Sequence, residues 1–378
     1  MSPQITSRFI VVNDLDMHIL EYKPSSPPGP EHVKTPLVLL LHGFPEMSYS
    51  WRKIIVPLAN AGFHVVAPDQ RGYGRTKNCT APDRIIQYND DLSPYRMLNL
   101  VKDIVSLVYT LGYTSVAAVV GHDFGSLVAG YSALIRPDVF KSVVLMSHPF
   151  SGPPPLGLSG VGPLGHALAA LTPPRKDYTE YYSTAEANTD MCNPPGGLGS
   201  FLRTYFHAKS ADSAHVTPYR LPSPMASDLV VMPQYYIMPL YESMPQAISL
   251  DAPSASSVAN NTWLPDTELD VYVSEYARTG FQGGLNWYRC IRDPRYSSEL
   301  QVLFGKKIDV PSMFIAGKMD WGVYKIPGGV ETMKDDICTR MEKEDFVLVD
   351  GAGHWVQQEK WEVVVGELLK FLYRHVIP

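Results

Sequence analysis

The segment Gly121-His122-Asp123-Phe124-Gly125 places an aspartate between two closely spaced glycines. A short apolar run ends just before this segment, and a helix-like stretch begins at Ser126. Glycines on both sides permit a turn too sharp for larger side chains, so the aspartate is presented at the N-terminus of the helix. A carboxylate presented in this way can attack an electrophilic carbon and form an ester. Taken alone, the pattern also fits an ordinary helix-capping aspartate.

Two further residues have the chemistry needed to hydrolyse such an ester. Asp320 follows an apolar run at 313–316, and His354 follows another at 346–349. Hydrolysis needs a general base, and a second carboxylate can hold a histidine in the required tautomer. Because the loops after parallel strands converge in one crevice, we expect Asp123, Asp320 and His354 to meet there. Their order along the chain, nucleophile, acid and histidine, is that of α/β-hydrolases.

Ester hydrolysis passes through a tetrahedral anion, which needs backbone N–H groups directed at it. We expect one oxyanion donor at Phe124, directly after the nucleophile. We expect the other at Phe44, in the loop His42-Gly43-Phe44-Pro45 after the first apolar run. His42 and His122 are interpreted as structural histidines.

The predicted strands and helices that position these residues are typical of an α/β fold. An N-terminal hairpin at 9–22 precedes short, continuous apolar runs, which alternate with helix-like stretches and predict a doubly wound, mostly parallel sheet. The strands are expected at 37–41, 64–67, 116–120 and 142–146, and the helices at 51–61, 98–111 and 126–136. After residue 150 the pattern stops, and it resumes with strands at 310–316 and 346–349 and a final amphipathic helix from Gln357 to about His375. We therefore predict an α/β-hydrolase core from residues 1–150 and 307–378, interrupted by a mainly helical cap at 151–306.

Composition narrows the class of partner. The chain has 378 residues, 45% of them hydrophobic, and a net charge of −6 without a dense basic tract, which argues against nucleic acid or an anionic membrane surface. The chain contains no run of 18 apolar residues, so we expect no membrane span, and the N-terminal residues predict a cytoplasmic protein. The four cysteines are far apart and lack Cys-x-x-Cys spacing, so we expect no metal site, no disulfide framework and no cofactor. No sequence signal selects an oligomeric state.

Several motifs taken together resemble the soluble epoxide hydrolases of the α/β-hydrolase fold, over nearly the whole chain. They are His42-Gly43-Phe44-Pro45-Glu46, Ser50-Trp51-Arg52, residues 69–74, Gly121 to Gly125, Thr279-Gly280-Phe281, Gly284 to Arg289 and Gly353-His354-Trp355. The resemblance implies that Asp123 attacks an epoxide carbon. Water activated by His354, which Asp320 orients, would then hydrolyse the ester to a vicinal diol.

The resemblance also implies that two cap tyrosines donate hydrogen bonds to the epoxide oxygen. An alkoxide is a poor leaving group at neutral pH, and a phenol of pKa about 10 can protonate it as it departs. Tyr288, in Asn286-Trp287-Tyr288-Arg289, matches the second tyrosine of the family pattern. Tyr178 matches the first, with Tyr181 and Tyr182 as competitors for the same role.

The substrate is the property that the resemblance transfers least well. The cap is longer than is typical of the family, and Ser147-His148-Pro149-Phe150 replaces a turn that usually contains asparagine. Pro45, His148, Trp287 and Trp355 are the expected substrate-binding residues. The segment 320–324 is similar to fungal members, which makes an epoxide of secondary metabolism as plausible as one of detoxification or of lipids.

Three alternative functions remain open on sequence alone. A haloalkane or haloacid dehalogenase also uses an aspartate, a histidine and an acid, but position 124 holds phenylalanine rather than the halide-binding tryptophan of haloalkane dehalogenases. An epoxide-opening cyclase would use a hydroxyl group of the substrate in place of Asp123. A catalytically retired hydrolase would bind a small molecule without turnover, although Asp123, Asp320 and His354 are all present.

Overall fold

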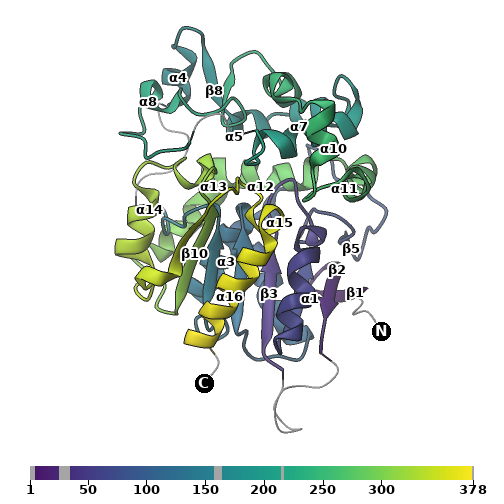
Figure 1. The fold of residues 1–378 in the computed structure, drawn as a ribbon, viewed down its shortest axis with the longest axis vertical. Helices are drawn as coiled ribbons and strands as arrows, with labels where there is room; N and C mark the ends of the chain where they lie inside the picture. Colours follow the sequence, from purple (N-terminus) through teal and green to yellow (C-terminus); the bar gives the residue numbers. More distant parts are fainter. Residues whose placement is uncertain (1–4, 25–34, 157–163, 214–216, 377–378) are drawn as a thin grey trace.

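The computed structural model describes residues 5–24, 35–156, 164–213 and 217–376. In these residues a nine-stranded sheet has the order β1-β2-β4-β3-β6-β7-β10-β11, with β5 paired to β2 (Figure 1). The strands are β1 (Thr6–Val12), β2 (Leu15–Tyr22), β3 (Leu37–Leu41), β4 (His64–Pro68), β5 (Lys77–Asn78), β6 (Ala118–His122), β7 (Val143–Met146), β10 (Ser312–Gly317) and β11 (Phe346–Val349). β1 and β2 form the expected antiparallel hairpin, and β4, β3, β6, β7, β10 and β11 pair in parallel.

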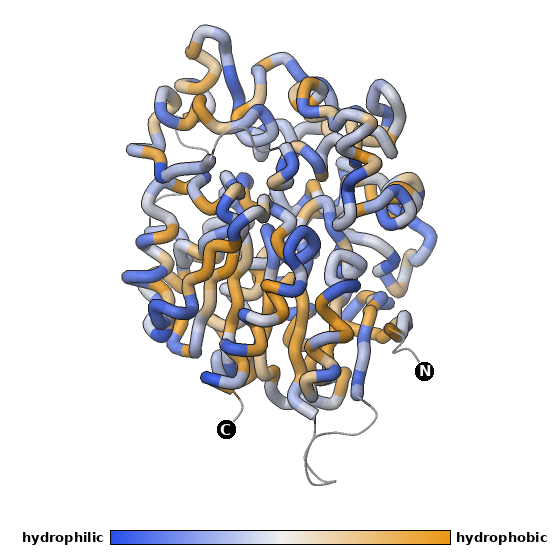
Figure 2. Tube along the Cα trace, viewed as in Figure 1, coloured by the Kyte–Doolittle hydropathy of each residue, from blue (hydrophilic) through white to orange (hydrophobic). Residues whose placement is uncertain are grey.

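The two faces of the sheet carry separate apolar clusters, because alternate residues of a strand point to opposite faces. In β3, Val38 and Leu40 pack with α1 (Arg52–Asn60) and α16 (Trp361–His375). Leu37, Leu39 and Leu41 pack on the other face with α2 (Met97–Thr110) and α3 (Phe124–Ile135). Burial on both faces explains why the strands are continuous apolar runs, which stand out as the hydrophobic centre of the molecule (Figure 2).

The remaining elements of the core are short. They are η1 (Ser48–Trp51), η2 (Ser93–Tyr95), η5 (Trp321–Val323), α14 (Gly329–Glu331), η6 (Thr332–Ile337), η7 (Lys343–Asp345) and α15 (Val356–Glu359). Several of them lie in the loops that leave the parallel strands.

The described residues of the segment 151–306, predicted as a cap, gather at one end of the sheet, with α12 and α13 next to the strands (Figure 1). Its helices are α4 (Leu164–Ala169), α5 (Tyr178–Tyr182), α6 (Glu186–Cys192), α7 (Gly197–Ala208), α8 (Ala226–Leu229), α9 (Met244–Ala247), η3 (Ser249–Asp251), α10 (Ala255–Asn260), α11 (Asp266–Thr279), α12 (Gln282–Arg292), α13 (Pro294–Ser297) and η4 (Ser298–Leu303). It also contains one two-stranded antiparallel sheet, formed by β8 (Arg175–Asp177) and β9 (Ile237–Pro239), which the sequence did not indicate.

Two boundaries differ from the sequence-based expectation in a way that matters for the site. The strand expected at 116–120 lies at 118–122, because Gly121 and His122 pair with Leu145 and Met146 of β7, so it continues up to Asp123. The final helix is broken at Lys360, where φ is −134° and ψ is 48°, and α15 is therefore separate from α16. The loop of His354 thus ends in its own short helix.

Candidate active site

Asp123 sits on a strained turn between β6 and α3. Its φ of 53° and ψ of −118° are unusual for a residue with a side chain. The turn is tight, since a Cβ atom on Gly125 would lie 2.3 Å from the carbonyl oxygen of Leu41, and one on Gly121 would lie 2.0 Å from that of Gly125. Glycine is therefore required at both positions, and the turn holds the Asp123 carboxylate at the edge of the sheet.

The three residues predicted to act together meet at this edge. Asp320 lies in the loop after β10, and His354 lies in the loop after β11. The Nδ1 atom of His354 is 3.0 Å from Oδ2 of Asp320, and its Nε2 atom is 3.3 Å from Oδ2 of Asp123. The other Asp320 oxygen accepts a hydrogen bond from the N–H of Gly322 at 2.7 Å. Nε2 of His354 is buried, and within the described residues its contact with Asp123 is an ion pair rather than a hydrogen bond.

One expected oxyanion donor is already directed at the nucleophile. The backbone N–H of Phe44, in the loop after β3, donates to Oδ1 of Asp123 at 3.0 Å. Phe124 follows Asp123 directly as the first residue of α3, where backbone N–H groups lack partners within the helix. A carboxylate oxygen of Asp123 therefore lies where donors can stabilise negative charge.

Charge in the site is balanced by these contacts. Burial by itself would raise the pKa of the Asp123 carboxyl group, but the His354 ring and the Lys209 ammonium hold that pKa well below its usual range. Burial favours neutral His354, yet Asp320 and Asp123 outweigh it and raise the pKa of His354 to about 9. Burial likewise opposes ionisation of Asp320, and His354 and the Gly322 N–H keep its pKa low. At neutral pH the resting site holds an imidazolium between two carboxylates.

A second layer of buried polar groups supports the histidine loop. Nε2 of His122 donates to the carbonyl oxygen of His354 at 2.7 Å, and Nδ1 of His122 is 2.6 Å from Oε2 of Glu46. The other oxygen of Glu46 accepts from Gln357 at 2.9 Å and from Gln358 at 2.7 Å. His122 is thus structural, as expected. Glu46 belongs to the motif at 42–46, but its role and that of the glutamines could not be predicted, because their partners are distant in the chain.

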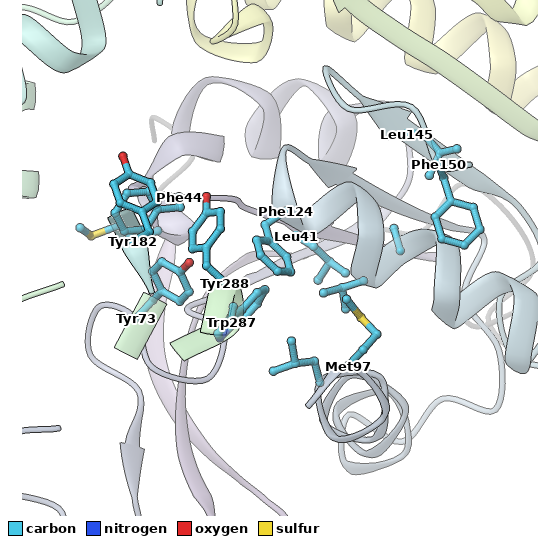
Figure 3. Packing of buried hydrophobic residues seen from close by; sticks show 14 of the residues in the cluster. Leu41, Phe44, Tyr73, Met97, Phe124, Leu145, Phe150, Tyr182, Trp287 and Tyr288 are labelled. Carbon is cyan, nitrogen blue, oxygen red and sulfur yellow. The ribbon is translucent and has the colours of Figure 1, made fainter. Parts of the chain in front are cut away.

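A cavity of about 560 Å³ opens onto Asp123 between the sheet and the segment 151–306. Its lining is mostly apolar and includes Phe124, Trp287 and Tyr288 (Figure 3). The Phe124 ring lies edge to face with that of Trp287, at a centroid distance of 5.0 Å, and with that of Tyr288, at 5.2 Å. Tyr178 also lines it, and the Tyr178 and Tyr288 ring centroids are 5.8 Å apart. Burial and the charge of Asp123 raise the pKa of both phenols well above the usual value, so both keep their protons at neutral pH.

The competing tyrosines have other partners. The hydroxyl of Tyr181 donates to Asp190 at 3.0 Å, and that of Tyr182 donates to Tyr205 at 3.0 Å. Neither residue is among those that line the cavity, whereas Tyr178 is. The structure therefore brings Tyr178 and Tyr288, of the tyrosines considered from sequence, into one cavity with Asp123.

Two of the four expected substrate-binding residues line this cavity, namely His148 and Trp287. Pro45 and Trp355 do not line it. Pro45 is buried and forms a cis peptide bond with Phe44, and Trp355 is fully buried, with its Nε1 donating to the carbonyl oxygen of Phe206 at 2.8 Å. Both belong to the loops that carry site residues, which explains why the motif pattern pointed to them.

Two lysines near the site were missed by sequence reasoning. The Nζ atom of Lys209 lies 4.9–5.7 Å from the ring centroids of Tyr205, Tyr235, Tyr236 and Trp355. Lys325 lines the cavity, with Nζ 4.0 Å from the ring centroid of Tyr178. Lys325 lies five residues after Asp320, but a lone lysine at that place has no distinctive sequence pattern.

One cluster in the described residues has the geometry to hold a metal ion, and it lies outside the cavity. Glu342, Asp345 and His375 place one ligand atom each within 4.8 Å of one another. Asp345 is already bonded to Arg374 at 2.8 Å and to His375 at 2.9 Å. The cluster is therefore accounted for as an ion-pair group at the C-terminal end of α16.

The sheet order, the strained aspartate turn and the convergence of Asp123, Asp320 and His354 define an α/β-hydrolase. Residues 36–159 match the alpha/beta hydrolase fold family. No helix within the described ranges combines the length and apolar character needed to cross a membrane.

The full-length comparisons define the family more narrowly. The chain is 32% identical over 375 residues to epoxide hydrolase A of Mycobacterium tuberculosis, with 97% of both chains covered. Its fold matches potato (Solanum tuberosum) epoxide hydrolase I with a TM-score of 0.73, 29% identity and coverage of 98% and 100% of the two chains. It matches epoxide hydrolase A of Mycobacterium thermoresistibile with a TM-score of 0.73, 30% identity and coverage of 98% of both chains. The chain belongs to the epoxide hydrolase family of the α/β-hydrolase fold.

Proposed function

We propose that this protein is an epoxide hydrolase that opens an epoxide through a covalent ester on Asp123 and releases a vicinal diol. The observation that carries the proposal is the position of His354 Nε2, which lies 3.3 Å from the Asp123 carboxylate. A base at this position can deliver a water molecule to the carbonyl carbon of an ester formed there. The family relationship to epoxide hydrolases supports the same chemistry.

In the first step, a carboxylate oxygen of Asp123 bonds to an epoxide carbon, and the C–O bond of the ring breaks. The departing oxygen takes a proton from a phenol, for which we propose Tyr178 and Tyr288 as the two donors. Both line the cavity with Asp123 and retain their protons at neutral pH. We propose that His148 and Trp287, which line the same cavity, help to bind the substrate.

In the second step, water attacks the ester carbonyl carbon while Nε2 of His354 takes its proton. His354 must be neutral for this, and ester formation removes the Asp123 charge that helps to keep it protonated. The backbone N–H groups of Phe44 and Phe124 would stabilise the tetrahedral anion. Its collapse breaks the bond to the alkyl oxygen, which receives the proton from His354 and leaves as the diol. The Asp123 carboxylic acid formed in this step then gives up its proton, and the tyrosinate left by ring opening takes one up, which restores the resting site.

We also propose a cellular compartment for the protein and a size class for its substrate. Cys290 and Cys338 are buried free thiols, and Cys79 and Cys192 are also unpaired, which supports an intracellular, reducing compartment. A cavity of about 560 Å³ is larger than a minimal epoxide needs. This size supports a bulky substrate, such as an epoxide of secondary metabolism.

The proposal is tested by trapping the ester on a His354→Gln variant. Mixing this variant with styrene oxide should give an intact mass increased by one substrate, and peptide mapping should place the addition on Asp123. The double variant Asp123→Asn/His354→Gln is the matched control and should remain unmodified. Absence of the adduct with an epoxide that the native protein hydrolyses, or equal modification of the double variant, would overturn the covalent mechanism.

A further inference from the structure

Apart from the nucleophile Asp123, the charged side chains that line the cavity gather in one region. Asp177, Glu180, Arg292 and Lys325 line it on the side of Tyr178, whereas residues such as Met97, Leu100, Leu127 and Phe150 form the apolar part. A substrate that matches this lining has an apolar body and one polar or charged group close to the reacting carbon.

Three of these four charged groups already have partners. The Asp177 carboxylate accepts hydrogen bonds from the backbone N–H and the hydroxyl of Thr179, which begins α5. Arg292 donates to the Thr179 hydroxyl at 3.0 Å and lies 3.8 Å from the Glu180 carboxylate. These contacts direct the three groups toward α5, and the charge of Arg292 is paired with that of Glu180.

Lys325 differs from them. Its Nζ atom lies over the Tyr178 ring, 4.0 Å from the centroid, and 5.6 Å from the centroid of Tyr236. Within the described parts of the chain it forms neither an ion pair nor a hydrogen bond, since its contacts there are with aromatic faces. Burial, together with the charges of Lys209 and Arg292, lowers the pKa of this ammonium, and Asp177 and Asp123 oppose that change. A partly buried ammonium without a paired anion is a costly feature unless an anion completes it.

We propose that Lys325 is the binding site for a carboxylate of the substrate, so that the preferred substrate is an epoxy carboxylic acid. This inference rests on the proposed function and specifies its substrate class. The Lys325 ammonium lies over the Tyr178 ring, and we propose Tyr178 as a proton donor to the epoxide oxygen. A substrate carboxylate bound to Lys325 is therefore held within about the width of one aromatic ring from the Tyr178 hydroxyl group. The acid group is therefore close to the oxirane, and the apolar body extends into the remaining cavity.

A substrate carboxylate at this position also needs a nearby positive charge, which Lys325 provides. A substrate carboxylate near the oxirane also lies near the Asp123 carboxylate, and two like charges in a buried site repel each other strongly. Lys325 offsets this repulsion with one positive charge, which matches a monoanion.

The test compares short epoxy acids with their methyl esters. We would measure kcat/KM for terminal epoxyalkanoates with increasing chain length between the oxirane and the carboxylate, for each matched ester, and for the Lys325→Met and Lys325→Glu variants. Circular dichroism would verify that the variants fold. The matched control is Lys334→Met, because Lys334 also lies over an aromatic ring, 4.5 Å from the Phe346 centroid, but outside the cavity.

We expect the native enzyme to prefer the acid over its ester by about tenfold or more at one short chain length. Lys325→Met should reduce that acid-to-ester ratio by at least the same factor, Lys325→Glu should invert it, and Lys334→Met should leave it unchanged. Efficient hydrolysis of the esters without an acid preference at any length, or an equal loss for acid and ester in Lys325→Met, would overturn the inference while the proposed function stands. Failure to hydrolyse any epoxide would instead overturn the proposed function.

Discussion

At the scale of residues, the site depends on one imidazole shared by two carboxylates. His354 contacts Asp320 through Nδ1 and faces Asp123 through Nε2, and its pKa is raised to about 9. In the resting state this pairing keeps Asp123 ionised and ready to attack. After alkylation Asp123 is a neutral ester, so one of the two charges that raise the pKa of His354 is gone. The same contacts can therefore serve both steps in sequence.

This leads to a pH dependence that differs between the two steps. Ester hydrolysis needs neutral His354, so its rate should rise with pH and level off, with a midpoint below 9, the value of the resting enzyme. Ester formation needs only ionised Asp123 and protonated phenols, and should change little over the same range. Single-turnover experiments that follow formation and decay of the ester separately would measure both rates. A decay rate that falls as pH rises, or a midpoint at or above 9, would contradict this interpretation.

At the scale of elements, the tight contact between β6, α3 and the loop after β3 creates the reactive geometry. The contact depends on Gly121 and Gly125, where a side chain would overlap neighbouring backbone oxygens. The strain at Asp123, whose φ is 53°, is sustained because the sheet and α3 around it are fully packed.

Adding a methyl group at Gly125 should therefore damage both stability and activity. We expect Gly125→Ala to lower the free energy of unfolding by about 1–3 kcal/mol or more, because its Cβ would lie 2.3 Å from the Leu41 carbonyl oxygen. The control is Gly366→Ala in α16, where a Cβ meets nothing within 4 Å. It should raise stability by about 0.5–1 kcal/mol, the ordinary helix-propensity difference. Chemical denaturation measures both, and equal effects of the two substitutions would show that the elbow is not tightly packed.

Sequence patterns anticipated the elements of the core well, for a physical reason. β3 and β11 occupy the predicted residues, and α1 and α2 lie within one residue of their predicted limits, because strands buried on both faces and amphipathic helices leave strong local signals. The β8–β9 pair was missed, since its strands have three residues each and are separated by about sixty residues of chain. The break at Lys360 was missed because the sequence on both sides is helix-forming.

The sequence also predicted part of the candidate site. Asp123, Asp320 and His354 could be placed together because the carboxyl ends of parallel strands share one edge. The choice of Tyr178 over Tyr181 and Tyr182 required the structure, since neighbouring tyrosines on a short helix face different surroundings. Lys325 escaped attention because a lone lysine in a loop has no distinctive pattern until its aromatic partner and the cavity are known.

At the scale of the whole molecule, the segment 151–306 is fixed to the core by polar contacts around α11 and α12. Nε1 of Trp287 donates to the Arg71 carbonyl oxygen at 3.0 Å, and Arg75 pairs with Glu275 at 2.6 Å. The backbones also touch, since a Cβ on Gly283 would lie 2.0 Å from the carbonyl oxygen of Gly72. These contacts determine the distance between α12 and the core, and therefore the position of Tyr288 relative to Asp123.

A small increase in the distance between α12 and the core should slow opening of the epoxide ring. We expect Gly283→Ala to displace α12 from the core and to reduce the rate of ester formation by about tenfold or more, since small misplacements of a catalytic group have large effects. Stopped-flow tryptophan fluorescence during ester formation would provide the rate. Gly199→Ala in α7 is the control, because its Cβ has room, 3.8 Å from Val273 Cγ2. An unchanged rate in Gly283→Ala would mean that the position of Tyr288 does not depend on this contact.

The central claim, that an oxygen of Asp123 becomes bonded to the substrate, is tested most directly by one turnover in heavy-oxygen water. With enzyme in excess over epoxide, the diol should contain no heavy oxygen from the first turnover, and the peptide that carries Asp123 should gain one. Mass spectrometry of the diol and of that peptide measures both. A labelled diol together with an unlabelled Asp123 peptide would show that water attacks the epoxide directly and would contradict the account.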